Sequence, residues 1–297
     1  MTFGGIITAM VTPFDADGEL AEDAAARLVR HLLDNGSDGL VLAGTTGESA
    51  TLTDEEKVRL WKVGVAAAGG APVIAGTGSN DTRHTVELTE RAQQAGVSGV
   101  LVVTPYYNKP NRAGLVAHFE AAAGATDLPV VLYNIPSRSV IDLPNDLLAE
   151  LAAIPNVVAV KQARYEDLAP IDGLDLLAGN DDVLAEVLDM GGTGGILVAS
   201  NLVGAEMRRL VDEPDRRTEI QDSLKPLYEA LGVAPLAAST KAALNMLGHD
   251  VGGTRLPIVD LSEDERATIR SALDAQGLLE TDAKHLASVP NPSRTSA

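Results

Sequence analysis

Lys161 ends the apolar run PNVVAVK, residues 155–161, and no other residue in this sequence points as directly to chemistry. A charged ammonium in apolar surroundings is costly, so a lysine at the end of a buried strand needs an explanation. Burial disfavours the charged form of an amine, and a neutral amine attacks a ketone to form a Schiff base. Lys161 therefore indicates carbon–carbon bond chemistry on a keto acid. The alternative is a strand-end lysine whose ammonium extends into water.

A glycine- and threonine-rich segment follows an earlier apolar run. It reads GTTGES, residues 44–49. Gly44 and Gly47 permit a tight turn that brings backbone N–H groups close to a ligand, and Thr45 and Thr46 add two hydroxyls. The segment suits a carboxylate, and an ordinary Gly/Thr loop is the alternative.

Tyrosine hydroxyls and an arginine follow two further apolar runs. VTPYYNKP, residues 103–110, has two adjacent tyrosines, of which Tyr107 is the second, and LYNIPSRS, residues 132–139, contains Tyr133 and Arg138. The chain has only five tyrosines, so two of them at one strand end are informative. Arginine binds carboxylates in a bidentate manner, which makes Arg138 a candidate for substrate binding. A surface arginine is the alternative.

These residues need a scaffold that brings strand ends together. Short apolar runs predict strands at residues 4–9, 39–43, 72–76, 98–103, 129–134, 156–161, 174–178 and 194–199. Amphipathic stretches predict helices near residues 21–35, 54–68, 81–95, 111–124, 144–153, 165–171, 181–190 and 202–211. Eight strands that are apolar on both faces and alternate with eight helices predict a closed parallel (β/α)8 barrel, a TIM barrel. In such a barrel the carboxyl ends of the strands form the active face.

The alternation stops near residue 212. The segments at 218–232, 235–248 and 262–279 predict three helices with little strand between them, so we expect a barrel over residues 1–212 and a C-terminal helical appendix over 213–283. Residues 284–297 are rich in Ser, Pro and Asn, and we expect a disordered tail there.

Composition narrows the function classes. The net charge of −19 disfavours binding to nucleic acids and anionic membranes. The chain has no cysteine, which excludes disulfides, thiol catalysis and thiolate metal sites. It has neither an apolar run long enough to span a membrane nor the features of a secretion signal, so we expect a cytoplasmic protein. The five histidines are far apart in sequence, which argues against a metal-dependent aldolase, and we expect neither a metal nor a cofactor.

The combination of GTTGE, TPYYNKP, YNIPSR and a strand-ending lysine resembles the dihydrodipicolinate synthase (4-hydroxy-tetrahydrodipicolinate synthase) family, in the N-acetylneuraminate lyase superfamily. The resemblance extends from residue 3 to about residue 280. It implies a TIM barrel with C-terminal helices, in a homotetramer built as a dimer of tight dimers. The implied reaction condenses pyruvate with L-aspartate 4-semialdehyde in diaminopimelate and lysine biosynthesis.

The resemblance also implies catalytic roles. Lys161 would form the Schiff base with pyruvate, and Tyr133 would act beside it as general acid/base. Thr45 would connect Tyr133 to Tyr107, which would extend into the neighbouring subunit's site. The intact set argues against a non-catalytic barrel.

Further residues would bind the substrates. Thr46 would hold the pyruvate carboxylate, and Arg138 would bind the carboxylate of the semialdehyde. The backbone at Gly179 and Ile196 would line the pyruvate pocket.

One departure from the family concerns the segment after the lysine. Many members read Glu-Ala-Thr-Gly or Asp-Ala/Ser-x-Gly there, whereas this chain reads Gln162, Ala163, Arg164 and Tyr165. This change keeps a class I 2-keto-3-deoxy sugar-acid aldolase of the same superfamily open as an alternative.

A second departure concerns regulation. In lysine-inhibited members, lysine binds at the tight-dimer interface, and the matching positions here are Ser49, Ala50, Asp54, Lys57, Asn80, His84 and Tyr106. Sensitive members have a glutamate where this chain has His84, and commonly a histidine where it has Lys57. Both changes disfavour a cationic ligand, so we expect free lysine to be a weak inhibitor.

Overall fold

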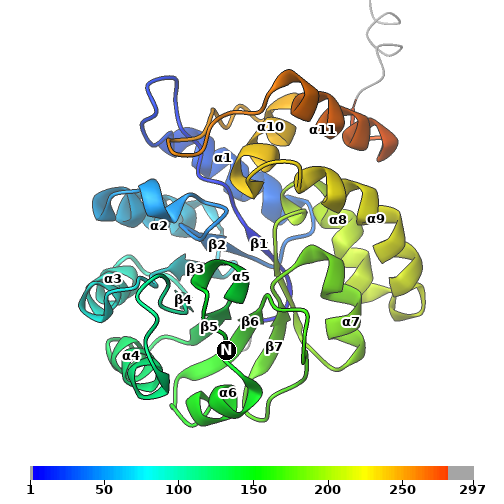
Figure 1. The fold of residues 1–297 in the computed structure, drawn as a ribbon. Coiled ribbons are helices and arrows are strands. Elements are labelled where there is room, and N and C mark those ends of the chain that lie inside the picture. Colours follow the sequence, from blue (N-terminus) through cyan, green and yellow to red (C-terminus); the bar gives the residue numbers. More distant parts are fainter. Residues whose placement is uncertain (1–2, 280–297) are drawn as a thin grey trace, which may run out of the picture.

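The computed structural model describes residues 3–279, in which eight parallel strands close into a single barrel (Figure 1). The strands are β1 (Gly5–Ala9), β2 (Gly39–Leu42), β3 (Val73–Gly76), β4 (Gly99–Val103), β5 (Val130–Asn134), β6 (Val157–Gln162), β7 (Asp175–Ala178) and β8 (Gly194–Leu197). Each strand pairs with its neighbours in sequence, and β8 pairs with β1. The prediction of a TIM barrel is confirmed.

Helices connect most of the strands and surround the barrel (Figure 1). They are α1 (Glu22–Asp34), α2 (Asp54–Ala67), α3 (Thr82–Gln94), α4 (Arg112–Gly124), α6 (Asn145–Leu151), α7 (Leu184–Asp189) and α8 (Ser200–Asp212). Local signals set several of their starts. Thr53 and Glu56 form a capping box at α2, and the side chains of Asp81 and Asn111 cap α3 and α4.

Two connections differ from the prediction. A short helix, α5 (Pro136–Ser139), lies directly after β5, at the barrel opening (Figure 1). The helix predicted near residues 165–171 is wrong, because this segment has no helix between β6 and β7. Pro170 disfavours helical backbone at the residue before it, and the few residues between Lys161 and Pro170 leave no room for a stable helix.

The barrel interior is a core of its own. Alternate strand residues point inward and pack together as Ile7, Val41, Ile74, Leu101, Val131, Ala159, Leu177 and Ile196. The second and larger core lies between the strands and the helices. Because the inward direction recurs every second residue, Tyr133 and Lys161 lie two residues beyond Val131 and Ala159 and also point into the barrel.

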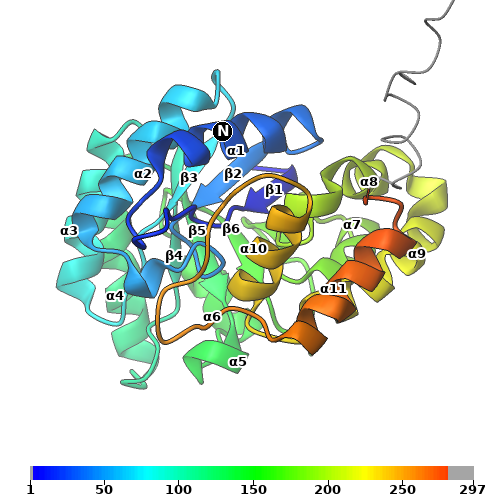
Figure 2. The same ribbon diagram turned by 90° about the horizontal axis from the view of Figure 1, so that it is seen from above.

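Three helices follow the barrel, as predicted: α9 (Arg217–Leu231), α10 (Leu236–Met246) and α11 (Glu263–Ala275). They contact one another, and α9 and α10 pack against α8 (Figures 1 and 2). The division into a barrel and a helical part at residue 212 stays a prediction, and the predicted tail at 284–297 lies outside the described residues. Within residues 3–279, no helix is long and apolar enough to cross a membrane.

Candidate active site

Strand register brings Lys161 and Tyr133 together. The two residues are direct partners across the β5–β6 pair, and the Lys161 Nζ atom lies 4.2 Å from the centroid of the Tyr133 ring. Both side chains are buried, with relative exposures of 5%. Lys161 is the penultimate residue of β6 rather than its last, because Gln162 extends the strand. An amine at the carboxyl end of a barrel strand, beside a phenol, is placed to react with a ligand in the barrel opening.

Two of the predicted substrate-binding positions lie in the same part of the barrel. Ile196 lies in β8 and is fully buried in the interior core. Gly179 follows β7, and its N–H donates a hydrogen bond to the carbonyl of Gln162, 2.8 Å away. A Cβ atom at Gly179 would come within 2.7 Å of that carbonyl oxygen, so the close approach of this residue to the end of β6 requires glycine.

The segment at residues 44–49 follows β2 and is held by its own hydrogen bonds. The Ser49 N–H donates to the Gly44 carbonyl at 3.2 Å, and the Thr12 hydroxyl donates to the Gly47 carbonyl at 2.6 Å. Thr46 is buried, whereas Thr45 is exposed. The turn therefore presents its two threonines differently, one inward and one to solvent.

Two further residues of the predicted site are exposed to solvent. Tyr107 is 85% exposed and has a left-handed backbone, with φ of 75°. Arg138 lies on α5 and is also exposed. Among the described residues, no hydrogen bond joins the Tyr133 hydroxyl to Thr45 or Tyr107, and the relay through these residues stays a prediction.

Asp181 was missed by the sequence analysis. The Asp181 carboxylate accepts hydrogen bonds from the Val198 and Ala199 N–H groups at 2.9 and 3.1 Å. It also lies close enough to Lys161 for the two side chains to interact electrostatically. Burial raises the pKa of Asp181 to about 6, against the opposing effects of the two N–H groups and of Lys161. The only sequence signal was its position just after a strand, which it shares with many residues.

The departure after Lys161 has a definite structure. The Gln162 side-chain oxygen accepts a hydrogen bond from the Asn134 side chain at 2.9 Å. The Arg164 guanidinium forms an ion pair with Asp142 at 2.6 Å and is largely buried. Gln162 thus joins the ends of β5 and β6, and Arg164 joins the segment after β6 to the segment after β5, which contains Arg138. Tyr165 is exposed, and its hydroxyl donates to the Asp182 carboxylate at 3.2 Å.

Comparisons with known proteins agree with this geometry. The model of the dihydrodipicolinate synthetase family matches residues 2–276. The chain is 42% identical over 289 residues to 4-hydroxy-tetrahydrodipicolinate synthase 1 of Halalkalibacterium halodurans, covering 93% of this chain and 98% of that protein.

Solved structures give the same result. Dihydrodipicolinate synthase of Cyanidioschyzon merolae with lysine bound has a TM-score of 0.90 and 41% identity, covering 93% of this chain and 99% of that one. The Acinetobacter baumannii enzyme, complexed with pyruvate, has a TM-score of 0.90 and 34% identity, covering 94% of this chain and 100% of that one. With this fold and this sequence similarity, the chain belongs to the dihydrodipicolinate synthetase family and is an enzyme, a lyase of that family.

Proposed function

We propose that the enzyme condenses pyruvate with L-aspartate 4-semialdehyde to 4-hydroxy-tetrahydrodipicolinate, through a Schiff base on Lys161. The observation that supports this most is the buried contact between Lys161 and Tyr133 at the carboxyl ends of β5 and β6. The similarity to the Halalkalibacterium 4-hydroxy-tetrahydrodipicolinate synthase supports the reaction, and pyruvate in the Acinetobacter structure supports the first substrate.

The chemistry balances without an oxidant or a cofactor. The Lys161 amine attacks the pyruvate keto carbon, and loss of water gives an imine. Tyr133 is the general acid/base that moves protons to and from the departing oxygen. Removal of a methyl proton gives an enamine, whose carbon attacks the aldehyde. The amine of the semialdehyde then attacks the imine carbon, closes the ring and releases Lys161.

Binding groups surround this centre. Thr46, buried in the turn after β2, provides a hydroxyl for the pyruvate carboxylate. The backbone around Gly179 and Ile196 lines the same pocket. Arg138 stands further out on α5, where its guanidinium binds the carboxylate of the semialdehyde.

Tyr107 gives the oligomer a role in catalysis. Its side chain extends away from its own chain, which suits a residue that completes the site of a neighbouring subunit. Thr45, also exposed, would then connect this Tyr107 to Tyr133. On this proposal the active form contains at least the tight dimer, within a homotetramer in the cytoplasm.

An assay with two substrate sets tests the function. Pyruvate with L-aspartate 4-semialdehyde is compared with cleavage of 2-keto-3-deoxy sugar acids under the same conditions. We expect turnover only with the first set. Turnover of the sugar acids in its place would identify the enzyme as the sugar-acid aldolase that the altered segment at 162–165 left open.

A further inference from the structure

A buried ion pair joins the turn after β2 to the C-terminal helices. The Lys241 Nζ atom, on α10, lies 2.7 Å from Oε1 of Glu48, and the two side chains are 2% and 0% exposed. Glu48 is the fifth residue of GTTGES, two residues after Thr46, which is proposed to bind the pyruvate carboxylate. The proposed mechanism uses neither member of this pair.

Lys241 is held on more than one side. Its ammonium donates a hydrogen bond to the Gly253 carbonyl at 2.6 Å and lies 3.9 Å from the centroid of the Phe14 ring. Burial lowers the pKa of Lys241, while the Glu48 carboxylate opposes that shift. The ammonium is therefore in a fixed position, between the β1–α1 segment and the segment after α10.

Arg255 extends the contact. Its backbone N–H donates to Oε2 of Glu48 at 2.9 Å, and its guanidinium donates to the Thr51 carbonyl at 3.0 Å. The same guanidinium binds the Glu56 carboxylate, and that hydrogen bond is the main reason that the pKa of Glu56 falls to about 2. Both ends of the segment from Glu48 to Glu56 are thus bound by residues that follow the barrel.

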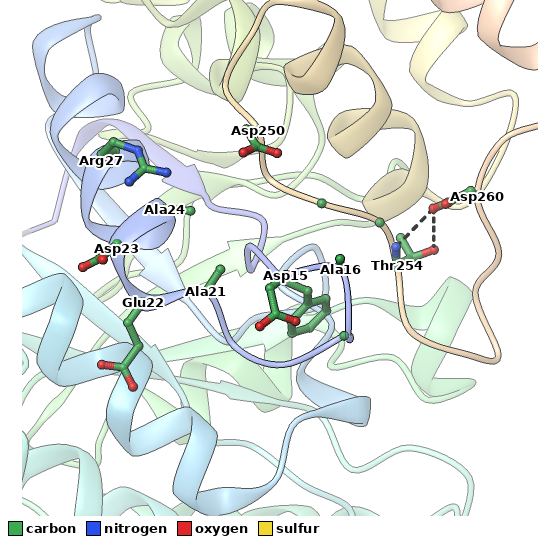
Figure 3. A pocket seen from close by; sticks show the side chains of 14 residues that line it. Asp15, Ala16, Ala21, Glu22, Asp23, Ala24, Arg27, Asp250, Thr254 and Asp260 are labelled. Atoms are coloured by element: carbon green, nitrogen blue, oxygen red, sulfur yellow. Dashed lines mark hydrogen bonds between the residues drawn. The ribbon is translucent and has the colours of Figure 1, made fainter.

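The segment that carries Arg255 is itself ordered by internal contacts. Thr254 donates hydrogen bonds from its N–H and its hydroxyl to the Asp260 side chain, at 3.2 and 3.4 Å (Figure 3). The Phe14 N–H donates to the Val251 carbonyl at 3.1 Å, which joins the segment to the β1–α1 segment near Asp15 and Ala16 (Figure 3). The Glu48 carboxylate is therefore bound by a structured partner.

The backbone at Glu48 shows what this contact does. Glu48 has a left-handed conformation, with φ of 54° and ψ of 38°, which a residue other than glycine rarely adopts. Strained conformations persist where the surroundings fix them. The Glu48 N–H donates to the Thr45 carbonyl at 3.1 Å, which couples the position of Glu48 to that of Thr45.

Stability alone does not explain the pair. A buried ion pair is often no more stabilising than apolar side chains of the same shape, because both charges lose their hydration. The pair does fix the position of the Glu48 side chain, because its carboxylate is bound both by Lys241 and by the Arg255 N–H.

We propose that Glu48 and Lys241 are positioning residues, through which the C-terminal helices hold the turn at residues 44–49 in its ligand-binding form. The identity of the ligand as pyruvate rests on the proposed function. The coupling between α10 and the turn does not.

Removing the ammonium tests the coupling. In Lys241→Met we expect faster amide hydrogen exchange in residues 43–51 and an increase of about 10-fold in the KM for pyruvate. The KM for the semialdehyde should stay within about twofold. If Lys241→Met does not fold, Glu48→Gln is expected to change the same two measurements in the same direction. Unchanged exchange in residues 43–51 would overturn the inference whatever the enzyme's substrate.

Arg217→Met is the matched control. Arg217, on α9, forms an ion pair with Asp189 on α7 at 2.7 Å, so it also joins the C-terminal helices to the barrel. The helices α7 and α9 lie on the side of the barrel opposite α2 and α3 (Figure 1). We expect a lower Tm without a change in the KM for pyruvate or in the exchange of residues 43–51. A shift in either of those two would mean that any loosening of the C-terminal helices has the same effect, and the specific role of Glu48 and Lys241 would be wrong.

The double variant Glu48→Gln, Lys241→Met separates an effect on the position of the turn from an effect on the stability of the protein. It leaves no unpaired buried charge, so we expect its Tm to recover relative to Lys241→Met, while the KM for pyruvate stays high. Recovery of both together would show that the pair acts through stability only. Failure of the wild-type enzyme to trap pyruvate on Lys161 would refute the proposed function instead, and the exchange contrast would still decide the coupling.

Discussion

The inner and outer parts of the candidate site differ in how completely one chain builds them. Lys161, Tyr133 and Thr46 are buried, and the first two lie in contact within the barrel. Tyr107 and Arg138 are exposed on segments beyond the strand ends. Strand register fixes Lys161 and Tyr133, whereas Thr46 is held by the turn after β2. On our proposal, a neighbouring subunit and the second substrate complete the environment of the outer residues.

On our proposal, the buried residues of the barrel carry out imine formation, and the exposed residues bind the second substrate and exchange protons with solvent. Imine formation needs a desolvated amine and an adjacent acid, which a closed barrel provides by itself. Recognition of the semialdehyde and proton exchange with solvent need groups that reach outward. Mutations in the two parts should therefore differ both in size and in which measurement they change.

The largest effect is expected at the centre of the inner part. Lys161→Ala should lower kcat/KM by ~10³-fold or more, because the nucleophile is lost. Borohydride reduction in the presence of pyruvate should add the corresponding mass to the wild-type peptide that contains Lys161. The exposed Lys62 provides a control, since Lys62→Ala should keep normal activity. Labelling of a different lysine would show that the assignment of the nucleophile is wrong.

The next effect tests the boundary between subunits. Tyr107→Phe should lower kcat by about 100-fold, within the range for loss of a proton-transfer group. Mixing it with Lys161→Ala subunits should restore part of the activity, because a hybrid dimer would contain one intact site. Tyr106→Phe is the control at the adjacent residue and should remain active. Hybrids that form but stay inactive would contradict a shared site.

A smaller and more selective effect is expected at Arg138. Arg138→Ala should increase the KM for the semialdehyde by roughly 10- to 100-fold, since a lost charge-assisted contact typically costs about 1.5–3 kcal/mol. The KM for pyruvate should change much less. Arg112→Ala, at an exposed arginine on α4 that binds Asp146 and Glu150, is a control that should change neither value. Equal increases for both substrates would place Arg138 in a structural role.

The smallest effect concerns free lysine. His84 lies 2.9 Å from Asp54, and the Lys57 ammonium and the Arg91 guanidinium lie within 4 Å of the same carboxylate. Burial raises the pKa of Asp54, but the hydrogen bond from His84 and the charges of His84, Lys57 and Arg91 outweigh it and lower the pKa. A cationic ligand would have to compete with groups that this chain already provides, so half-inhibition is expected only above about 1 mM.

Titrating lysine into the coupled assay measures this directly. The Cyanidioschyzon relative, whose structure has lysine bound, offers a comparison enzyme for the same titration. In this chain, His84→Glu should increase sensitivity, because it replaces a partner of Asp54 with a negative charge. Half-inhibition of the wild-type enzyme well below 1 mM, about −4 kcal/mol of binding, would show that the interpretation of His84 and Lys57 is mistaken.

Patterns within short stretches of the sequence determined much of the architecture. Apolar runs and amphipathic periods predicted all eight strands, most of the helices and the closed barrel. They also placed Lys161 near the end of β6, because a lysine in an otherwise apolar run is a local anomaly. The helix near 165–171 was predicted from amphipathic periodicity. It does not form, because Pro170 disfavours helical backbone there.

Only the tertiary structure decided which side chains meet. Tyr133 touches Lys161 because of the β5–β6 register, and Asp181 comes near Lys161 because β7 lies beside β6. The pairing of Glu48 with Lys241 has no local signature at all, since each is a common charged residue in a turn or on a helix. Local periodicity reports which face of an element is apolar. It does not predict which distant charged residue will pair with a buried one, because that pairing depends on the packing and desolvation of the whole chain.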